Sequence, residues 1–414
     1  MFPLSNMLKS FVRVGSLTVI DADGGRHVFA GTPGSAVTMK LTDATLYRKL
    51  FFNPELHAGE AYMDGRLSFP GSSLRGFLEL FSRNRLALST QPVQQVLRRI
   101  SRGLKRFQQS NPIGKAQANV AHHYDLGNAF YKLFLDEDMF YSCAYFRQDT
   151  DTLEAAQQSK CRLIAAKLNL KPGMKVLDIG SGWGGLARYL ARVADVDVTG
   201  VTLSKEQYAL AVETTKAAGL DGAVRFELED YRNLTAKFDR IVSVGMFEHV
   251  GVHHYPEFFA KVNNLMTDDG VMLLHSIGHM SPPGTASPWL RKYIFPGAYS
   301  PALSEVFPAV EDNSLWVTDV EFLRVHYATT LRHWHERFEA NRARIAEMYD
   351  ERFCRMWEFY LISAEMMFRT GSQEVFHMQL AKKRDAAPIV RDYASDVQRR
   401  YEQVERERGF YRGT

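Results

Sequence analysis

The 414-residue sequence predicts an α/β protein in which a doubly wound parallel sheet forms the larger part and a small α+β domain precedes it. From residue 171 onwards, short apolar runs alternate with helical stretches, which is typical of a parallel sheet covered by helices. These runs are residues 175–179, 196–202, 224–228, 238–244 and 270–276. We therefore expect ligands to bind at the carboxyl ends of these strands.

The predicted N-terminal domain rests on strand and turn patterns. β-branched residues at 17–20, 27–30 and 36–41 flank turns rich in Asp and Gly, which is the signature of hairpins. We place this domain at residues 1–90, a basic amphipathic helix at 91–114 and a catalytic domain at 115–414. The chain after residue 371 is expected to be a helical tail.

Composition excludes several classes of protein. Hydrophobic residues at 45% and charged residues at 24% are close to globular averages, which disfavours disordered, collagen-like and coiled-coil chains. Cys143, Cys161 and Cys354 lie far apart, so we expect neither a disulfide framework nor a zinc finger, and we expect a reducing compartment. No signal peptide and no apolar run of about 18 residues is visible, so a cytoplasmic protein without a membrane span is predicted.

Charge is unevenly distributed along the chain. Residues 1–120 carry a net charge of +9 and residues 121–414 one of −5, and residues 81–120 contain no Asp or Glu. Within 91–109, apolar residues recur at helical spacing and basic residues cover the opposite side. Such a helix either packs on its own protein with a solvated basic face or lies on anionic phospholipid. Nucleic acid is disfavoured because no nucleic-acid motif accompanies the charge.

A glycine-rich motif follows the run at 175–179. The motif at residues 178–185 (DIGSGWGG) opens a helix, and its glycines allow close backbone approach to a ligand. A nicotinamide dinucleotide is disfavoured because the second run ends in Thr202, Leu203 and Ser204 rather than in an acidic residue. With Asp178 ahead of Gly-x-Gly, the motif resembles that of the S-adenosylmethionine-dependent methyltransferases.

Further motifs resemble one branch of that superfamily, the cyclopropane-fatty-acyl-phospholipid synthases and the related mycolic acid cyclopropane synthases. They stand at residues 123–128 (HYDLGN), 141–146 (YSCAYF), 200–204 (GVTLS), 244–251 (VGMFEHVG), 273–278 (LLHSIG), 326–331 (HYATTL) and 352–357 (RFCRMW). Residues 59–65 (GEAYMDG) resemble the phospholipid-acting members. The resemblance implies a Rossmann-like class I methyltransferase domain and a C-methyltransferase activity.

The resemblance also implies two sets of site residues. The S-adenosylmethionine set is Tyr141, Ser142, Asp178, Gly180, Gly182, Thr202, Leu203, Gln207, Asp230 and Tyr231. The catalytic set, implied to hold a bicarbonate ion that acts as base, is Glu248, His275 and Tyr327 through their side chains, and Cys143 and Ile277 mainly through backbone groups. Aromatic faces stabilise cations, and the candidates for that role are Tyr141, Tyr145, Phe146, Phe247 and Tyr327.

The implied substrate is a membrane phospholipid with cis-unsaturated acyl chains, reached by a protein docked on an anionic membrane surface at the inner face of the membrane. Rival interpretations are a methyl-branched, methylene or hydroxylated acyl product, a small-molecule methyltransferase and a non-catalytic lipid-binding protein. A metal site at Glu248, His249, His253 and His254 is disfavoured because no third ligand stands at recognisable spacing and Gly251 interrupts the segment. Homodimer formation is left open.

Overall fold

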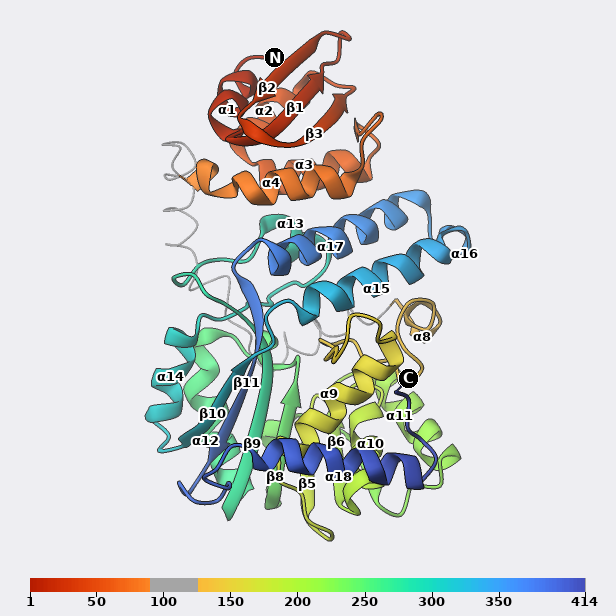
Figure 1. The fold of residues 1–414 in the computed structure, drawn as a ribbon, viewed down its shortest axis with the longest axis vertical. Coiled ribbons are helices and arrows are strands. Elements are labelled where there is room, and N and C mark those ends of the chain that lie inside the picture. The colour runs from red at the N-terminus through yellow and green to blue at the C-terminus, as the bar shows by residue number, and fades with distance from the viewer. Residues whose placement is uncertain (90–125, 414) are drawn as a thin grey trace. The chain divides into compact units, whose positions relative to one another are not determined.

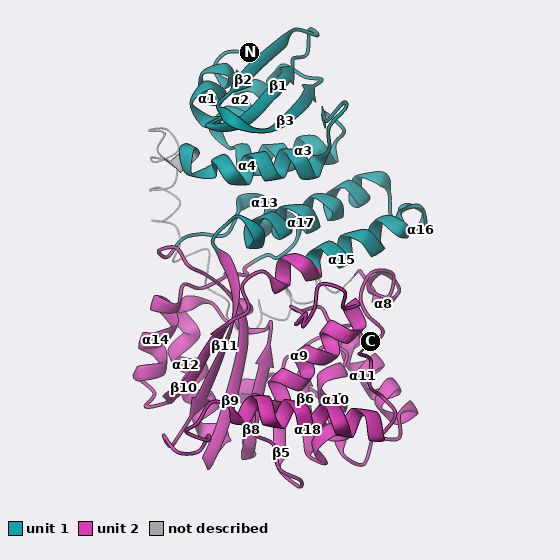
Figure 2. Ribbon diagram, in the orientation of Figure 1, with its two compact units in different colours: residues 1–108, 284–296, 331–372 teal, residues 109–283, 297–330, 373–414 magenta. Residues whose placement is uncertain are grey.

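The computed structural model describes residues 1–89 and 126–413 (Figure 1). It divides into two compact units that are interleaved along the chain (Figure 2). Unit 1 comprises residues 1–108, 284–296 and 331–372, and unit 2 comprises residues 109–283, 297–330 and 373–414. The stretch 115–414, expected to be one domain, therefore contributes two segments to unit 1. The basic helix predicted at 91–114 lies outside the described residues.

Unit 1 contains a four-stranded sheet with the order β2-β1-β3-β4. β1 (Val14–Ile20) pairs antiparallel with β2 (Arg26–Ala30) and parallel with β3 (Thr32–Leu41), which also pairs with β4 (Leu67–Ser68). Asp21 closes the β1–β2 turn, since its Oδ1 accepts hydrogen bonds from the N–H groups of Asp23 (3.1 Å) and Gly25 (2.8 Å). The three N-terminal strands expected from the sequence are confirmed.

Helices complete unit 1. They are α1 (Leu4–Phe11), α2 (Thr45–Phe52), α3 (Pro54–Met63), α4 (Leu74–Ser89), α13 (Pro288–Tyr293), α16 (Arg342–Met348) and α17 (Glu351–Arg369). The helix α15 (His326–Ala340) begins in unit 2 and ends in unit 1. Asn53 caps α3 by accepting the Leu56 N–H, and Pro54 at the first helical position needs no partner for an N–H.

The motif at 59–65 joins α3 to the later segments of unit 1. A Cβ at Gly59 would lie 2.4 Å from Trp289 Nε1 of α13, so only glycine permits this approach. Trp289 Nε1 in turn donates to Met63 Sδ (3.3 Å), and the Tyr62 hydroxyl donates to Glu358 Oε2 of α17 (2.7 Å). The motif therefore has a packing role within unit 1.

Unit 2 is built on a seven-stranded sheet with the order β10-β11-β9-β8-β5-β6-β7. The strands are β5 (Lys175–Ile179), β6 (Asp197–Thr202), β7 (Val224–Leu228), β8 (Phe238–Val244), β9 (Met266–His279), β10 (Trp316–Phe322) and β11 (Gln373–Ala381). β5 to β9 are parallel, whereas β11 runs antiparallel to both β9 and β10. The expected doubly wound parallel arrangement is confirmed, with two further strands, β10 and the antiparallel β11, at one edge.

Helices cover both faces of this sheet. α9 (Leu153–Lys167), α10 (Gly185–Ala194), α11 (Lys205–Ala217) and α18 (Tyr393–Glu407) share one core with Val176 and Val242. α12 (Tyr255–Leu265) and α14 (Leu303–Glu311) share the other with Leu177 and Ile241. Neighbouring residues of one strand therefore pack into opposite cores, because successive side chains of a β-strand point to opposite faces of the sheet. Shorter turns are α8 (Asn128–Tyr131), η1 (Tyr231–Asn233), η2 (Phe247–His249) and η3 (Val252–His254).

The expectation of a helical tail after residue 371 is wrong for its first part. Residues 373–381 form β11, which lies between β9 and β10, and eight of its nine residues are buried. A strand buried on both faces lacks the alternation of a half-exposed strand, so a short apolar run is ambiguous in sequence. The later part does form a helix, α18.

The described residues include no helix that is both long enough and apolar enough to cross a membrane.

Candidate active site

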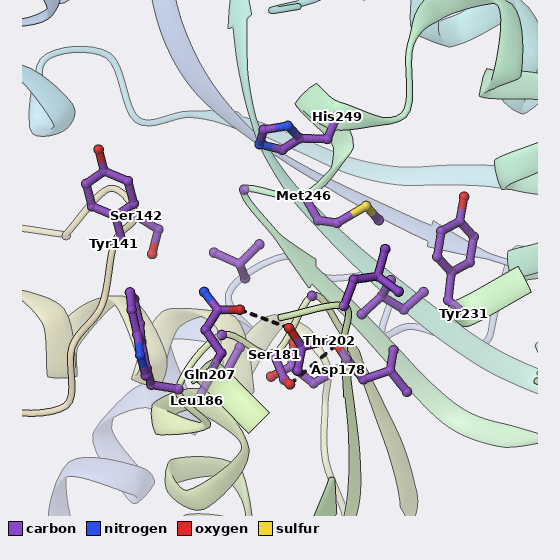
Figure 3. Close-up of a pocket in the computed structure, with 18 of the residues that line it drawn as sticks. Tyr141, Ser142, Asp178, Ser181, Leu186, Thr202, Gln207, Tyr231, Met246 and His249 are labelled. Atoms are coloured by element: carbon purple, nitrogen blue, oxygen red, sulfur yellow. Dashed lines mark hydrogen bonds between the residues drawn. The ribbon is translucent and has the colours of Figure 1, made fainter. Parts of the chain in front are cut away.

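A cavity lies at the carboxyl ends of β5, β6 and β8 in unit 2 (Figure 3). The strand order reverses direction at β5, and this is where doubly wound sheets bind ligands. The ten residues predicted to hold the cofactor all line this cavity: Tyr141, Ser142, Asp178, Gly180, Gly182, Thr202, Leu203, Gln207, Asp230 and Tyr231. In Figure 3, Tyr141 and Ser142 lie on one side of it and Tyr231 on the other.

The glycine motif forms the turn between β5 and α10. The N–H groups of Gly180 (2.9 Å) and Ser181 (3.0 Å) both donate to the Val201 carbonyl of β6, which folds the turn over the end of that strand. Gly180 has a φ of +81°, and a Cβ there would lie 2.8 Å from the Met246 Cβ. Glycine at 180 is therefore needed both for the backbone angle and for the approach of the segment after β8.

Thr202 and Gln207 form a buried pair on the β6 side of the cavity. The Thr202 hydroxyl donates to Gln207 Oε1 (2.9 Å), and Ser204 caps α11 by accepting the Gln207 N–H (3.3 Å). The bond from Thr202 to Gln207 Oε1 fixes the orientation of the Gln207 amide. The amide nitrogen lies on the side away from Thr202, where it can donate to a ligand (Figure 3). A donor of this kind suits a ribose hydroxyl.

Asp178 is a buried acid at the end of β5. Its Oδ2 has no hydrogen-bond partner among the described residues. Burial raises the pKa of this carboxyl to about 7, against a smaller opposing effect of the Lys160 ammonium. An orphaned buried carboxylate is costly in the folded chain, so it is favourably placed to receive a ligand donor or a positive charge.

Asp230 is held by its neighbour. Arg232 donates to the two Asp230 carboxylate oxygens from Nε (2.8 Å) and Nη2 (2.6 Å), and the Arg232 N–H adds a third bond (3.0 Å). Burial opposes ionisation of Asp230, but the Arg232 bonds outweigh it and hold the carboxyl pKa below its usual value. Asp230 therefore faces the cavity as an oriented anion.

Lys160, which the sequence patterns did not single out, lines the same cavity from α9. It is 1% exposed, its Nζ donates to Ser142 Oγ (3.0 Å), and it lies 3.6 Å from the centre of the Phe140 ring. One turn earlier, Gln157 Nε2 donates to the Ser142 carbonyl (3.1 Å). Burial lowers the pKa of the Lys160 ammonium. α9 thus fixes the segment that carries Tyr141 and Ser142.

Other residues that line the cavity were not assigned to it from the sequence, among them Met246, His249 and Trp183. Met246 and His249 come from the segment after β8 and are drawn in Figure 3, and burial lowers the pKa of His249 to about 4. Trp183, inside the glycine motif, donates from Nε1 to Asn128 Oδ1 (2.7 Å). Asn128 ends the motif at 123–128, of which residues 126–128 are described. Trp183 could have been identified from the sequence, because it lies within the glycine motif.

Glu248 and Ile277 of the predicted catalytic set are in direct contact. The Ile277 N–H donates to Glu248 Oε1 (2.7 Å), while Glu248 Oε2 is buried without a partner among the described residues. Burial raises the pKa of the Glu248 carboxyl to about 7, although the Ile277 bond favours the ionised form. The Ile277 backbone therefore positions the carboxylate, and one oxygen of Glu248 remains for a further ligand.

His275 stands two residues before Ile277 on the same face of β9. It is 2% exposed, and its Nδ1 lies 2.8 Å from Nε2 of His377 on β11, its partner in the β9–β11 register. Burial, assisted by Lys160 and Lys167, lowers the pKa of His275 to about 3, so its ring is neutral at physiological pH. His377 was not identified from the sequence because its strand was not recognised.

Cys143 and Tyr327 are buried and belong to two segments that are tied together. The Ala144 N–H donates to Thr330 Oγ1 (3.0 Å), and the Phe146 N–H donates to His326 Nδ1 (3.2 Å). The first turn of α15, which carries Tyr327, is thereby fixed to the motif at 141–146. Burial raises the pKa of the Cys143 thiol far above neutrality, which makes it a poor nucleophile.

The structure places one sequence-based candidate, Phe247, differently and also bears on the metal site that the sequence disfavoured. Phe247 is fully buried in the core and stacks on Tyr255 at 4.2 Å between ring centres, so it is a packing residue. The segment with Glu248, His249 and His253 forms two separate 3₁₀ turns around Gly251, whose φ is +84°. The helical face that the Glu-His-x3-His spacing would have required is not formed.

The sheet order and the cavity at the ends of β5, β6 and β8 define a class I S-adenosylmethionine-dependent methyltransferase. The family model of mycolic acid cyclopropane synthetase matches residues 113–378. The chain is 39% identical over 356 residues to the cyclopropane-fatty-acyl-phospholipid synthase of Escherichia coli strain K12, an alignment that covers 84% of this chain and 89% of that one. It is 37% identical to a probable fatty acid methyltransferase of Pseudomonas putida, over 82% of this chain and 85% of the relative.

Among solved structures, mycolic acid cyclopropane synthase CmaA1 complexed with SAH and CTAB aligns with a TM-score of 0.62 and 35% identity. That alignment covers 66% of this chain and 99% of CmaA1. The chain belongs to the mycolic acid cyclopropane synthetase family, and the family recognised from the sequence motifs is confirmed.

Proposed function

We propose that this protein is a cyclopropane-fatty-acyl-phospholipid synthase, which adds a methylene group from S-adenosylmethionine across the cis double bond of phospholipid acyl chains. The observation that carries the proposal is the similarity to the E. coli enzyme, which extends over 84% of the chain. The family model matches only residues 113–378, so the alignment with the E. coli enzyme also includes many residues outside that match.

The cavity fits S-adenosylmethionine, which when bound supplies an electrophilic methyl group to the double bond. Its floor has glycine at 180, where a side chain would collide with Met246, and its wall has the orphaned oxygen of Asp178. Gln207 and Asp230 would hold the ribose and adenine ends, and the 141–142 segment fixed by Lys160 would close over the cofactor. The Asp178 carboxylate offers negative charge near a cationic ligand.

The catalytic set fits a small anion that carries a proton. In the proposed reaction the double bond would take the methyl group of S-adenosylmethionine, which would leave as S-adenosylhomocysteine. A bicarbonate ion held by these residues would supply the base for the proton that the transferred methyl group loses as the ring closes. Glu248 Oε2 has no partner in the part of the chain that the structure describes, and a carboxyl with a pKa of about 7 shares a proton readily with an ionisable neighbour. The side chains of Glu248, His275 and Tyr327 would hold the ion, with backbone help around Cys143 and Ile277.

The substrate requires contact with a membrane. We propose that unit 1 and the basic segment at 91–114 dock the protein, from the cytoplasm, on an anionic phospholipid surface. Arg98, Arg99 and Arg102 supply charge that attracts anionic headgroups, each adding about 1 kcal/mol. Homodimer formation remains a proposal that analytical ultracentrifugation tests.

Deleting residues 1–90 is an unsuitable test of docking, because α3 packs on α13 and α17 within unit 1. The better variant replaces Arg98, Arg99 and Arg102 together with glutamine. We expect weaker sedimentation with anionic vesicles and unchanged activity on detergent-dispersed phospholipid. Replacing Lys171, Lys216 and Arg225, three exposed basic residues of unit 2, with glutamine is the control for overall charge. Equal vesicle binding by the two triple variants would contradict this assignment.

A second product is favoured by one comparison, the similarity to a probable fatty acid methyltransferase. The alternative enzyme would share the first step and release a methyl-branched, methylene or hydroxylated chain. The test incubates the protein with S-adenosylmethionine and cis-unsaturated phospholipid vesicles and analyses the released acyl chains. Mass spectrometry should show the gain of one CH2, and proton NMR should show a cyclopropane. A vinyl or branched-methyl signal favours the alternative, and no mass change contradicts both.

A further inference from the structure

We call Glu248, Ile277 and His275 the Glu248–His275 cluster, because Glu248 accepts the Ile277 N–H and His275 lies two residues before Ile277 on β9. The contact between His275 and His377 joins this cluster to the antiparallel strand β11. The two residues are direct partners in the β9–β11 register, and His275 Nδ1 and His377 Nε2 are 2.8 Å apart. Both rings are buried, His377 completely. Among the described residues, the His275 side chain makes this one hydrogen bond, so its other ring nitrogen, Nε2, can bind a ligand.

Both rings are neutral. Burial lowers the pKa of each imidazole, and the ammonium groups of Lys160 and Lys167 on α9 lower both further. His326 at the start of α15 acts on His377 in the same direction. A hydrogen bond between two neutral imidazoles needs one donor and one acceptor, so only two arrangements of the protons are compatible with the contact.

The surroundings of His377 distinguish these two arrangements. If His275 Nδ1–H donated, the His377 proton would be on Nδ1, an atom that is buried and has no partner among the described residues. A buried N–H group without an acceptor is rare and costly. If His377 Nε2–H donates instead, His377 Nδ1 carries only a lone pair, and the N–H that needs a partner is that of His275 Nε2. That atom is not among the fully buried unpartnered atoms of the described residues, whereas His377 Nδ1 is.

We propose that His377 is a positioning residue that donates its Nε2–H to His275 Nδ1 and thereby holds His275 in the Nε2–H tautomer. In that tautomer His275 is a hydrogen-bond donor to an anion at the active site. The identity of the anion as bicarbonate rests on the proposed function, whereas the tautomer does not. The role resembles that of partners which orient metal-binding histidines through their other ring nitrogen.

The direct test is the tautomer of His275 in the full-length protein. Long-range proton–nitrogen correlation spectra of protein labelled with ¹⁵N-histidine distinguish protonated from unprotonated ring nitrogens. The signals are assigned with the variants His275→Gln and His377→Gln. We expect a protonated Nε2 and an unprotonated Nδ1 for His275. Protonation of His275 at Nδ1, or double protonation of either ring at neutral pH, would overturn the proposal.

Two substitutions of His377 separate the donor from the bulk of the ring. His377→Gln places an amide N–H near the position of Nε2, so His275 should keep its tautomer. His377→Phe retains an aromatic ring but removes the donor, so the Nδ1–H form of His275 should appear. Met378→Leu, the next buried residue on the strand, is the control and should leave the His275 signals unchanged. An unchanged His275 tautomer in His377→Phe would overturn the proposal.

Activity measurements add a second readout. We expect kcat to fall about 10-fold or more in His377→Phe and to recover in His377→Gln. The dissociation constant for S-adenosylmethionine should stay unchanged, because His377 does not line the cofactor cavity. Wild-type kcat in His377→Phe would overturn the positioning role. A wild-type rate independent of bicarbonate would instead contradict the proposed function and leave the tautomer result standing.

Discussion

The cofactor cavity and the Glu248–His275 cluster lie at the same edge of the sheet, but they are built from different parts of the sequence. The cavity is formed by loops that directly follow β5, β6, β7 and β8. The cluster requires β9 to pair with β11, and His275 and His377 are 102 positions apart. Asp178 in the cavity and Glu248 in the cluster are alike, because each is a buried acid with a pKa raised to about 7 and with one oxygen that has no partner among the described residues.

Because of this difference, we expect the cavity to determine cofactor binding and the cluster to determine the rate of the chemical step. The residues that line the cavity include all ten predicted cofactor residues and none of the five predicted catalytic residues. Changes in the cluster should therefore lower the rate with cofactor affinity intact, and changes in the cavity should lower affinity first.

The largest effect is expected from Glu248→Gln. Glutamine keeps the shape and can still accept the Ile277 N–H, but it cannot exchange a proton. We predict a loss of kcat of about 100-fold or more, with an unchanged dissociation constant for S-adenosylmethionine by calorimetry. A parallel loss of cofactor affinity would show that the cluster and the cavity are one site.

The next effect is expected from Gly180→Ala. The added Cβ would meet Met246 at 2.8 Å, and the positive φ adds strain of about 1–2 kcal/mol. We predict at least about a 10-fold weaker cofactor affinity, equivalent to about 1.4 kcal/mol. Gly173→Ala is the matched control, since Gly173 has a φ of +78° and no atom near its absent Cβ. Equal loss of affinity in both variants would exclude the Met246 contact as the cause.

A smaller effect, on stability, is expected from Asp178→Asn. Burial raises the pKa of Asp178 from 3.8 to about 7, so its contribution to stability is fully present below pH about 4 and is lost as the pH rises through about 7. Asparagine does not ionise, so the cofactor-free variant should exceed the wild type by about 1–3 kcal/mol at high pH and lose this advantage at low pH.

Thermal unfolding at about pH 5 and about pH 8 checks this dependence. The control is Asp195→Asn, because hydrogen bonds from Arg408 lower the pKa of Asp195 and give the opposite trend with pH. A gain for Asp178→Asn that is equal at both pH values would show that burial of the charge is not its cause.

The smallest effect is expected from Cys143→Ala. The buried thiol is neutral and donates to the adjacent Ala144 carbonyl (3.3 Å). We predict that kcat falls by less than about 10-fold, which corresponds to the modest worth of one neutral hydrogen bond. A loss as large as that of Glu248→Gln, measured under the same conditions, would contradict the backbone role assigned to this residue.

Most of the cavity was predictable because its signals are local. Asp178 and Thr202 lie at the carboxyl ends of β5 and β6, the glycine motif continues directly from β5, and parallel strands bring their carboxyl ends together. Lys160 was not predictable, because a lysine in a helix is ordinarily solvated and its burial depends on the tertiary fold.

The cluster was predictable only in part. Family motifs indicated Glu248 and His275, but the partner on β11 depends on strand pairing over a long sequence separation, which leaves no local pattern. The same reason explains the assignment of segments 284–296 and 331–372 to unit 1, since α13 and α17 are joined to α3 by contacts such as Trp289 with Met63.

The most direct test of the central claim is the rate of the wild-type enzyme in buffer stripped of carbon dioxide, with and without added bicarbonate. Cofactor affinity is measured alongside by calorimetry. If the Glu248–His275 cluster holds the anion that accepts the proton, the rate falls in stripped buffer and recovers with bicarbonate, while the affinity for S-adenosylmethionine stays constant. A rate that is the same at every bicarbonate concentration would contradict the claim.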